Sequence, residues 1–477
     1  MKGFILCGLG ILICCNISFS QLVSDTFLVS YTMQQVDSVY TANGIPTFAG
    51  EVNYPVDVYK IIYQTPGPLG DTTTASGALF IPQNTPCGAP LISYQHGTIS
   101  NNSNVPSNMG GEFIIGLIAA AHGYVVSMPD YLGMGDGPGF HPYSHAATEA
   151  SAVLDLIRAG KTFCSNSGTP LNDQLFLMGY SQGGHATMAA IREIELYYPT
   201  EFNVVATVPM AGPYDISGVQ RELLESDSVY SQPGYLPYIM LGYNEVYGLF
   251  DSIQQVLKPP YDSLVEVLFD GNYGMGTING YMLDVPKLMI DSAYYANYEA
   301  DSLHPFKEAL RDNDLYDWVP QTYVMMIHCS GDEVVPFEHA QIAYDAFIAA
   351  GSDSVDLFDG GALGHSDCAE NAIIGAKLYI DSRAQFCDSS AVVYQESGFD
   401  ELKVFPNPNT GVFTVYAGGH KTGAIVVLDI LGRQTVSLSL SGDPMYSLDL
   451  TERGAGIYYV VVKGETGAAF TARVVVR

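Results

Sequence analysis

A serine between glycines lies at the centre of the stretch Leu175-Phe-Leu-Met-Gly-Tyr-Ser181-Gln-Gly-Gly-His185. An apolar run leads into Gly179-x-Ser181-x-Gly183, and an alanine-rich segment with helical spacing follows. This order predicts a strand, a sharp turn and a helix. In such a turn the serine backbone is strained, only small residues fit two positions away, and the serine oxygen stands clear of the chain. We therefore predict Ser181 as a nucleophile, although ordinary glycine-rich turns share the pattern.

A serine hydroxyl is a weak nucleophile, so it needs a general base, and the base needs an acid to orient it. In hydrolases with this kind of turn, the acid follows the serine along the chain and the histidine comes last. The expected strand at 322–328 leads into Cys-Ser-Gly-Asp332, which places a carboxylate at the carboxyl edge of a sheet. We predict Asp332 as the acid, because Glu333 should point away and Asp314 and Asp359 lack the turn context.

The general base has to be chosen among ten histidines. A lone histidine is usually structural, but His365 ends the glycine-rich stretch Gly360-Gly-Ala-Leu-Gly-His365 and follows both the serine and the acid. A loop of this kind gives a triad histidine the mobility it requires. We predict His365 as the general base.

Acyl transfer also needs two backbone N–H groups aimed at the tetrahedral oxyanion, and losing one raises the barrier by about 3 kcal/mol. One should come from Gln182, directly after the serine at the start of the predicted helix. The other should come from the loop that follows Ser93-Tyr-Gln-His-Gly97-Thr98. We assign Thr98, with Gly97 as the close alternative; the stretch could also be no more than a turn. This chemistry requires no metal or organic cofactor.

The elements that must position these residues alternate between strand-like and helix-like runs. Strands are expected at 56–63, 76–81, 90–95, 124–128, 174–178, 204–208, 322–328 and 355–358. Helices are expected at 112–121, 145–163, 182–197, 337–349 and 369–380. This alternation predicts an α/β fold with a mainly parallel sheet and helices on both faces.

The alternation is interrupted at about 214–310, a segment rich in tyrosine, glycine and proline with weak helical patches. We predict a mostly helical cap inserted into the sheet. Aromatic rings with one polar tip suit a cap over an apolar cleft, and ordinary packing of an aromatic-rich lobe explains them equally well.

Composition and the first residues define where the protein works. The chain has 477 residues, 47% of them apolar, and a net charge of −31, so nucleic acid and anionic membrane surfaces are poor partners. Residues 1–20 combine Lys2, a short apolar core and a small-x-small site, which predicts a secretory signal peptide. No later apolar run is long enough for a transmembrane segment. The protein is expected to be exported.

Five cysteines follow the predicted signal peptide: Cys87, Cys164, Cys329, Cys368 and Cys387. Their spacing fits no zinc site, and the odd number leaves at least one thiol unpaired. We expect Cys329, at the end of an apolar strand, to be the free and buried one. The expected disulfides are then Cys87–Cys164 and Cys368–Cys387.

A linker is expected at 389–402, and beyond it short alternating runs at 411–416, 424–429, 446–450, 457–462 and 471–476 predict a small antiparallel β-sandwich at 403–477. The stretches Val404-Phe-Pro-Asn-Pro-Asn-Thr-Gly-Val-Phe-Thr414, Leu431-Gly-Arg433 and Gly454-Ala-Gly-Ile-Tyr-Tyr459 resemble the C-terminal sorting domain of type IX secretion cargo. The resemblance implies export through the type IX machinery across the outer membrane of a Gram-negative bacterium, followed by surface attachment or by release once the domain is removed. A carbohydrate-binding module is the alternative, but Trp318 is the only tryptophan and lies elsewhere.

The catalytic segment resembles the α/β-hydrolase superfamily, and within it the secretory lipases of lipase A type. The motifs are Tyr94-Gln-His-Gly-Thr98, Pro129-Asp-Tyr-Leu-Gly133, Leu154-Asp-x-x-Arg158-Ala, Gly179-Tyr-Ser-Gln-Gly-Gly184 and Cys329-Ser-Gly-Asp-Glu-Val-Val-Pro336. The resemblance spans about 50–385, within an expected catalytic domain at 21–388. It implies hydrolysis of small-molecule or lipid carboxylic esters by a Ser181–Asp332–His365 triad under an inserted cap.

Two other functions remain open at this stage. The same triad cleaves amides, so the chain could be an aminopeptidase-like serine peptidase whose acidic cap supplies a pair of carboxylates for a substrate amine. It could also be a surface binding protein with a relic triad, but such a relic should have lost at least one of the three residues. We expect a secreted or surface-attached serine carboxylic-ester hydrolase that works through an acyl-enzyme.

Overall fold

The structure, a computed structural model, describes residues 21–45, 51–386, 402–417, 423–429, 432–443, 445–464 and 469–476. The predicted signal peptide at 1–20 lies outside the described residues, as do Cys387 and the linker predicted at 389–402 except for its last residue.

A large sheet forms the centre of the molecule, with the strand order β1-β2-β3-β5-β4-β6-β7-β8-β9. The strands are β1 (Leu22–Tyr31), β2 (Val56–Pro66), β3 (Thr72–Pro82), β4 (Ala89–Gln95), β5 (Val125–Pro129), β6 (Leu171–Tyr180), β7 (Val204–Met210), β8 (Val324–His328) and β9 (Val355–Asp359). From β5 to β9, neighbouring strands are parallel, whereas β1, β2, β3 and β5 pair antiparallel. The mainly parallel sheet is confirmed. The alternation did not predict β1, which is mostly exposed or half-buried.

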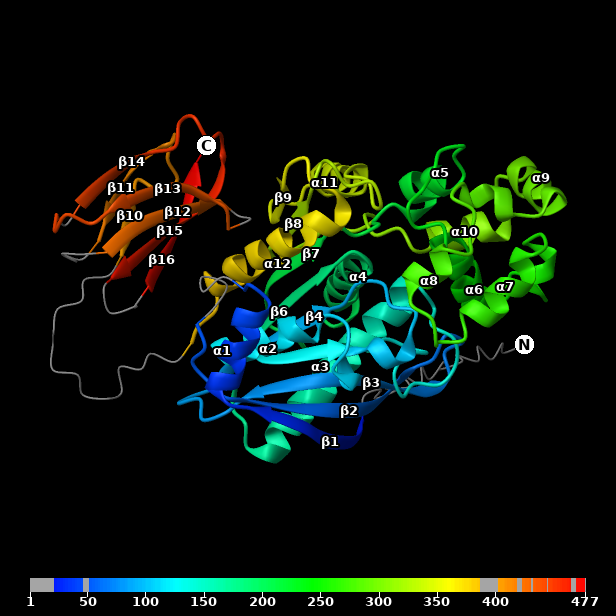
Figure 1. Cartoon of the computed structure of the whole chain (residues 1–477), viewed down its shortest axis with the longest axis horizontal. Coiled ribbons are helices and arrows are strands. Elements are labelled where there is room, and N and C mark those ends of the chain that lie inside the picture. The colour runs from blue at the N-terminus through cyan, green and yellow to red at the C-terminus, as the bar shows by residue number, and fades with distance from the viewer. Residues whose placement is uncertain are drawn as a thin grey trace, which may run out of the picture.

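Helices cover both faces of this sheet, as Figure 1 shows. On one face lie α3 (Ala146–Ser167), α4 (Gln182–Tyr197) and α11 (Glu338–Ala349). On the other face lie α1 (Met33–Ala42), α2 (Phe113–His122) and α12 (His365–Asp381). The central strands β4 and β5 are buried along their whole length, which is why both are mostly apolar and neither shows a regular alternation of apolar and polar residues.

A helical lobe lies between β7 and β8 in the chain and appears green at one end of the molecule in Figure 1. Its helices are α5 (Arg221–Leu224), α6 (Tyr235–Tyr247), α7 (Tyr261–Leu268), α8 (Met275–Asn279), α9 (Ser292–Ala300) and α10 (Pro305–Arg311). The lobe has a hydrophobic core of its own that contains many of its tyrosines. Several tyrosine hydroxyls also reach the loops below, because Tyr238 donates to the Ile99 carbonyl at 2.8 Å and Tyr243 to that of Ser144 at 3.0 Å. The tyrosines thus pack the lobe and attach it to the edge of the sheet.

The C-terminal region forms two antiparallel sheets around a separate apolar core. One sheet contains β10 (Lys403–Phe405), β11 (Val412–Tyr416) and β14 (Met445–Asp449), and the other contains β12 (Gly423–Asp429), β13 (Gln434–Ser439), β15 (Gly456–Gly464) and β16 (Ala469–Val476). The predicted antiparallel β-sandwich is confirmed.

The predicted disulfides are wrong. Cys329 is bonded to Cys368, with 6.1 Å between their Cα atoms, and Cys164 is the free, buried cysteine. Cys87 is also disulfide-bonded. Cys164 is buried on α3 among the side chains of the core, whereas Cys329 leaves β8 beside the first turn of α12, a contact between distant segments that sequence spacing does not reveal. Within the part of the chain that the structure describes, no helix is long and apolar enough to cross a membrane.

Candidate active site

Ser181 occupies the turn between β6 and α4 with φ 60° and ψ −122°, a left-handed backbone that residues with a side chain rarely adopt. The flanking glycines make this turn possible. A Cβ atom at Gly183 would lie 1.9 Å from the Gln95 carbonyl oxygen, and one at Gly179 would lie 2.4 Å from the Gly183 oxygen. The strained strand–turn–helix expected from the sequence is therefore present.

The three residues predicted as a triad come together at the carboxyl edge of the sheet. His365 Nε2 lies 2.9 Å from Ser181 Oγ, and His365 Nδ1 lies 2.6 Å from Asp332 Oδ2. All three residues are buried, with exposed fractions of 7%, 7% and 9% for Ser181, Asp332 and His365. This is the geometry in which a histidine can accept the serine proton while a carboxylate orients the ring.

The carboxylate of Asp332 is held at both oxygens. Oδ1 accepts hydrogen bonds from the Val334 and Val335 backbone N–H groups at 3.0 and 2.8 Å, and His328 Nε2 lies 3.3 Å from Oδ2. Burial alone would raise the pKa of Asp332, but its interactions with His328 and His365 lower that pKa well below its usual range. Asp332 therefore stays ionised.

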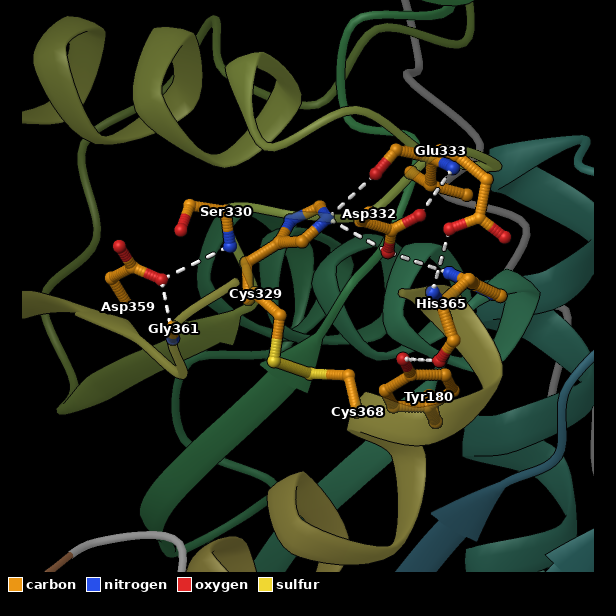
Figure 2. Close-up of a disulfide and its surroundings, with 11 residues drawn as sticks. Tyr180, Cys329, Ser330, Asp332, Glu333, Asp359, Gly361, His365 and Cys368 are labelled. Atoms are coloured by element: carbon orange, nitrogen blue, oxygen red, sulfur yellow. Dashed lines mark hydrogen bonds and ion pairs between the residues drawn. A yellow bond between two sulfur atoms is a disulfide. The ribbon is translucent and has the colours of Figure 1, made fainter. Parts of the chain in front are cut away.

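His365 is also held through its backbone, as Figure 2 shows. Glu333 accepts a hydrogen bond from the His365 N–H at 3.1 Å, and Tyr180 donates to the His365 carbonyl at 2.5 Å. Glu333 thus points to the backbone and leaves the ring to Asp332. The Cys329–Cys368 disulfide joins the loop before the acid to the turn after the histidine.

The two other candidate acids bind elsewhere. Asp359 accepts from the backbone N–H groups of Ser330 and Gly361 at 3.0 and 2.7 Å, and so ties together the loops that follow β8 and β9 (Figure 2). Asp314 accepts from Ser217. Neither is bonded to the His365 ring among the described contacts.

Of the residues predicted to hold the oxyanion, Gln182 directly follows Ser181, and Gly97 lies close to it, since an added Cβ at Gly97 would be 3.8 Å from Ser181 Cβ. The Gly97 N–H lies 3.3 Å from both carboxylate oxygens of Glu112, which also accepts from the Tyr94 hydroxyl at 2.5 Å. Burial raises the pKa of Glu112. No described residue accepts a hydrogen bond from the backbone N–H of Thr98 or Gln182. This distribution leaves the Thr98 amide available and occupies that of Gly97.

A buried polar network supports the first turn of α4. Gln182 Nε2 lies 2.8 Å from His141 Nε2 and donates to Glu149 at 2.9 Å, and the other Glu149 oxygen lies 2.7 Å from His185 Nδ1. Burial lowers the pKa of His141 to about 3, so its ring is neutral and can accept from Gln182. The network fixes the side chain next to the nucleophile.

Two stacked tyrosine rings lie next to Thr98. The Thr98 hydroxyl lies 2.8 Å from that of Tyr143, whose ring stacks on Tyr238 with 4.3 Å between centroids and 2° between planes. Tyr143 also lines a small cavity in front of Ser181. No sequence pattern pointed to Tyr143, Glu112, Glu149 or His328, because each comes from a different element and belongs to no local motif.

Comparison with known proteins agrees with this geometry. The family model of secretory lipases matches residues 107–383, which is more than half of the chain. The chain belongs to the secretory lipase family. This membership places its catalytic domain among the carboxylic ester hydrolases, as lipase or esterase, and confirms the resemblance inferred from the motifs.

Individual relatives are more distant. The chain is 21% identical to Lipase 2 of Candida albicans over 356 residues, 69% of this chain and 73% of that protein. It is 24% identical to Lipase 10 of the same yeast over 268 residues and spans only 56% of that relative's length.

Among solved structures, the ligand-bound rice cell wall degrading esterase LipA from Xanthomonas oryzae is 32% identical to this secretory lipase, with a TM-score of 0.65 over 72% of this chain and 92% of that one. Candida antarctica lipase A shares the α/β-hydrolase fold, with a TM-score of 0.60 at 16% identity over 76% of this chain and 82% of that one.

The C-terminal β-sandwich has a match of its own. Residues 403–477 match the model of the secretion system C-terminal sorting domain. The protein is therefore secreted or displayed at the cell surface, and the type IX resemblance of this region is confirmed.

Proposed function

We propose that this secretory lipase hydrolyses carboxylic esters through an acyl-enzyme formed on Ser181. The observation that carries the proposal is the unbroken chain of contacts from Ser181 Oγ to His365 and from His365 to Asp332, at 2.9 and 2.6 Å. Family membership supports the same reaction class.

In the first half-reaction Ser181 Oγ attacks the ester carbonyl carbon while His365 Nε2 takes the hydroxyl proton. His365 then gives that proton to the departing alcohol, and Asp332 stabilises the imidazolium that exists between these steps. In the second half-reaction His365 deprotonates a water molecule, which attacks the acyl carbon, and then gives this proton to Ser181 Oγ as the bond from Oγ to the acyl carbon breaks and the acid leaves. The Thr98 and Gln182 backbone N–H groups hold the oxyanion in both halves.

The cap supports a substrate with an apolar acyl group. The cavity in front of Ser181 is lined by Pro213, Ile216, Ile239 and Val335 together with aromatic and amide side chains. A second, mostly apolar cavity inside the cap shares Ile216, Gln220 and Ile239 with it. An acyl chain extending from Ser181 would pass these shared residues.

The reaction is tested by exposing the secreted protein to a fluorophosphonate probe and assaying p-nitrophenyl esters of increasing chain length beside aminoacyl amides. We expect the probe to label Ser181, the variant Ser181→Ala to be unlabelled, and esters to be cleaved much faster than amides. Absence of labelling, or turnover of amides alone, would contradict the proposal.

The acyl route is tested by Ile239→Trp. The larger ring should fill space at a residue that lines both cavities and lower kcat/KM for p-nitrophenyl octanoate by about tenfold, while the acetate ester changes less than about twofold. Val267→Trp is the matched control, because Val267 lies on α7 of the same cap and is 57% exposed. An equal loss for both esters would show that the route lies elsewhere.

The proposed division of the chain follows from the same reasoning. Residues 1–20 direct export, 21–388 form the catalytic domain with a cap at about 214–310, 389–402 form a linker, and 403–477 carry the sorting signal. We expect the type IX machinery to recognise this last segment, so that deleting residues 403–477 keeps the enzyme in the periplasm; secretion of the truncated chain would contradict this.

A further inference from the structure

His328 is the last residue of β8 and is fully buried, with its ring packed edge-on to Phe337 at 5.7 Å between centroids. Its two ring nitrogens have different surroundings. Nε2 lies 2.7 Å from the Val335 carbonyl oxygen and 3.3 Å from Asp332 Oδ2. Nδ1 is buried and has no hydrogen-bond partner among the described residues.

These contacts define which tautomer a neutral ring adopts. A carbonyl oxygen only accepts hydrogen bonds, so the proton is on Nε2, and in the neutral ring Nδ1 is a bare acceptor. Burying such an acceptor without a partner costs folding free energy, which an apolar ring of similar shape would avoid. The benefit of a histidine at this position therefore has to come from Nε2–H.

The Nε2–H group faces two oxygens of one turn, the Val335 carbonyl and the Asp332 carboxylate. The other Asp332 oxygen already accepts the N–H groups of Val334 and Val335. We propose that His328 is a positioning residue, which fixes Asp332 Oδ2 in line with His365 Nδ1. The inference rests on the proposed triad, because His328 acts on catalysis only through Asp332.

A second route of action is possible in principle, because Val335 also lines the cavity in front of Ser181. If His328 only held Val335 in place, its loss would change the fit of the acyl group and raise KM. If His328 acts through Asp332, its loss changes the orientation of the general base, His365, and lowers kcat. The two roles are therefore separated by the kinetic constant that changes.

The test compares His328→Phe with His328→Gln in the full secreted chain. Phenylalanine keeps the ring shape and removes the Nε2 donor. Replacing Nδ1 by carbon breaks no described hydrogen bond. The glutamine amide places a donor at similar reach. We expect His328→Phe to lower kcat for p-nitrophenyl butyrate by about 10- to 100-fold with KM within about twofold, and His328→Gln to recover most of that loss.

Combining His328→Phe with Asp332→Asn in one double variant sharpens the test. If His328 acts through the carboxylate, His328→Phe has no further effect on kcat in this background. His122→Phe is the control, because His122 is the last residue of α2, makes no described contact with the triad, and accepts a hydrogen bond at Nδ1 from the Glu51 N–H. We expect its kcat to match that of the wild type.

Three results would overturn the proposal: an unchanged kcat in His328→Phe, a rise in KM alone, or an equal loss in His328→Gln. If His328→Phe does not fold, His328→Asn replaces it, because its amide ends near Nδ1 and is too short to reach Val335. Failure of the proposed function is distinguishable, since the wild type itself would then neither bind the fluorophosphonate probe nor hydrolyse esters.

Discussion

Ser181 and His365 lie 2.9 Å apart, yet the chain holds them by different means. The nucleophile half of the site, residues 95–98 and 179–185, is fixed by close backbone packing around glycines. The acid–histidine half, residues 328–335 and 360–368, is fixed by side-chain hydrogen bonds to loop backbones and by a disulfide. A strained turn is specified within a few neighbouring residues, whereas two loops that are distant in sequence need bonds between them.

The acid–histidine half should therefore be most sensitive to loss of a single side-chain charge. Asp332→Asn keeps the shape of the side chain but no longer orients His365 and stabilises its imidazolium, so we expect kcat to fall by about 10⁴-fold. Steady-state kinetics with p-nitrophenyl butyrate measure this. Glu333→Gln is the control, because among the described hydrogen bonds Glu333 accepts from the His365 backbone N–H and not from the ring; a loss as large in this variant would place the acid at 333.

The disulfide tests how far the same half depends on a covalent link. The double variant Cys329→Ala/Cys368→Ala releases a link between residues 39 apart, which should lower the free energy of unfolding by about 4 kcal/mol. Denaturant titration measures the stability. Cys164→Ala is the control, because Cys164 is buried and unbonded and affects only packing. Equal stability of the double variant and the wild type would show that the hydrogen bonds alone hold the two loops.

The nucleophile half should instead fail when a methyl group is added. Gly183→Ala places a Cβ atom 1.9 Å from the Gln95 carbonyl oxygen, a backbone atom that cannot give way as the end of a flexible side chain could. We expect the free energy of unfolding to fall by roughly 3 kcal/mol and the folded fraction to react slowly with the fluorophosphonate probe. Gly276→Ala is the control, because the added Cβ meets nothing within 4 Å there and φ, as at Gly183, lies outside the left-handed range. Normal labelling of Gly183→Ala would contradict the view that the turn is sterically fixed.

The same difference explains what could be predicted from the sequence. The fold class followed from alternating strand-like and helix-like runs, and the nucleophile turn followed from local steric rules that require Gly179 and Gly183. Asp332 and His365 were predicted from their order along the chain, and the structure brings both to Ser181.

What could not be predicted depends on contacts between distant segments. Cys329 looked free because nothing near it in the sequence is its partner, and Cys368 approaches it only after β8 and α12 have packed. Glu149 and His328 gave no signal, since each becomes meaningful only beside a residue from another element. The cap was predicted to be mostly helical, but the bounds of its separate helices were not, because its core is built by irregular aromatic packing and not by regular periodicity.

Two buried carboxylates extend the comparison to pH, because their pKa values shift in opposite directions. In the acid–histidine half the pKa of Asp332 is below its unfolded value, so Asp332 adds stability that is complete above about pH 4 and is lost as the pH falls through the folded value. Glu112 contacts the nucleophile half through the Gly97 N–H, and burial raises its pKa, so stability falls as the pH rises from about 4.3 toward the folded value.

We predict that the Tm of Asp332→Asn changes less than that of the wild type between pH 4 and pH 2. This window begins at about pH 4 because an unperturbed Asp carboxyl has a pKa of about 4. Above about pH 4.3, Glu112→Gln should lack a decline that the wild type shows. Thermal melts across this range measure both. If the two variants change the dependence of Tm on pH in the same direction, the pKa values of Asp332 and Glu112 are shifted in the same direction. The hydrogen bonds that Glu112 accepts from Tyr94 and Gly97 would then outweigh its burial.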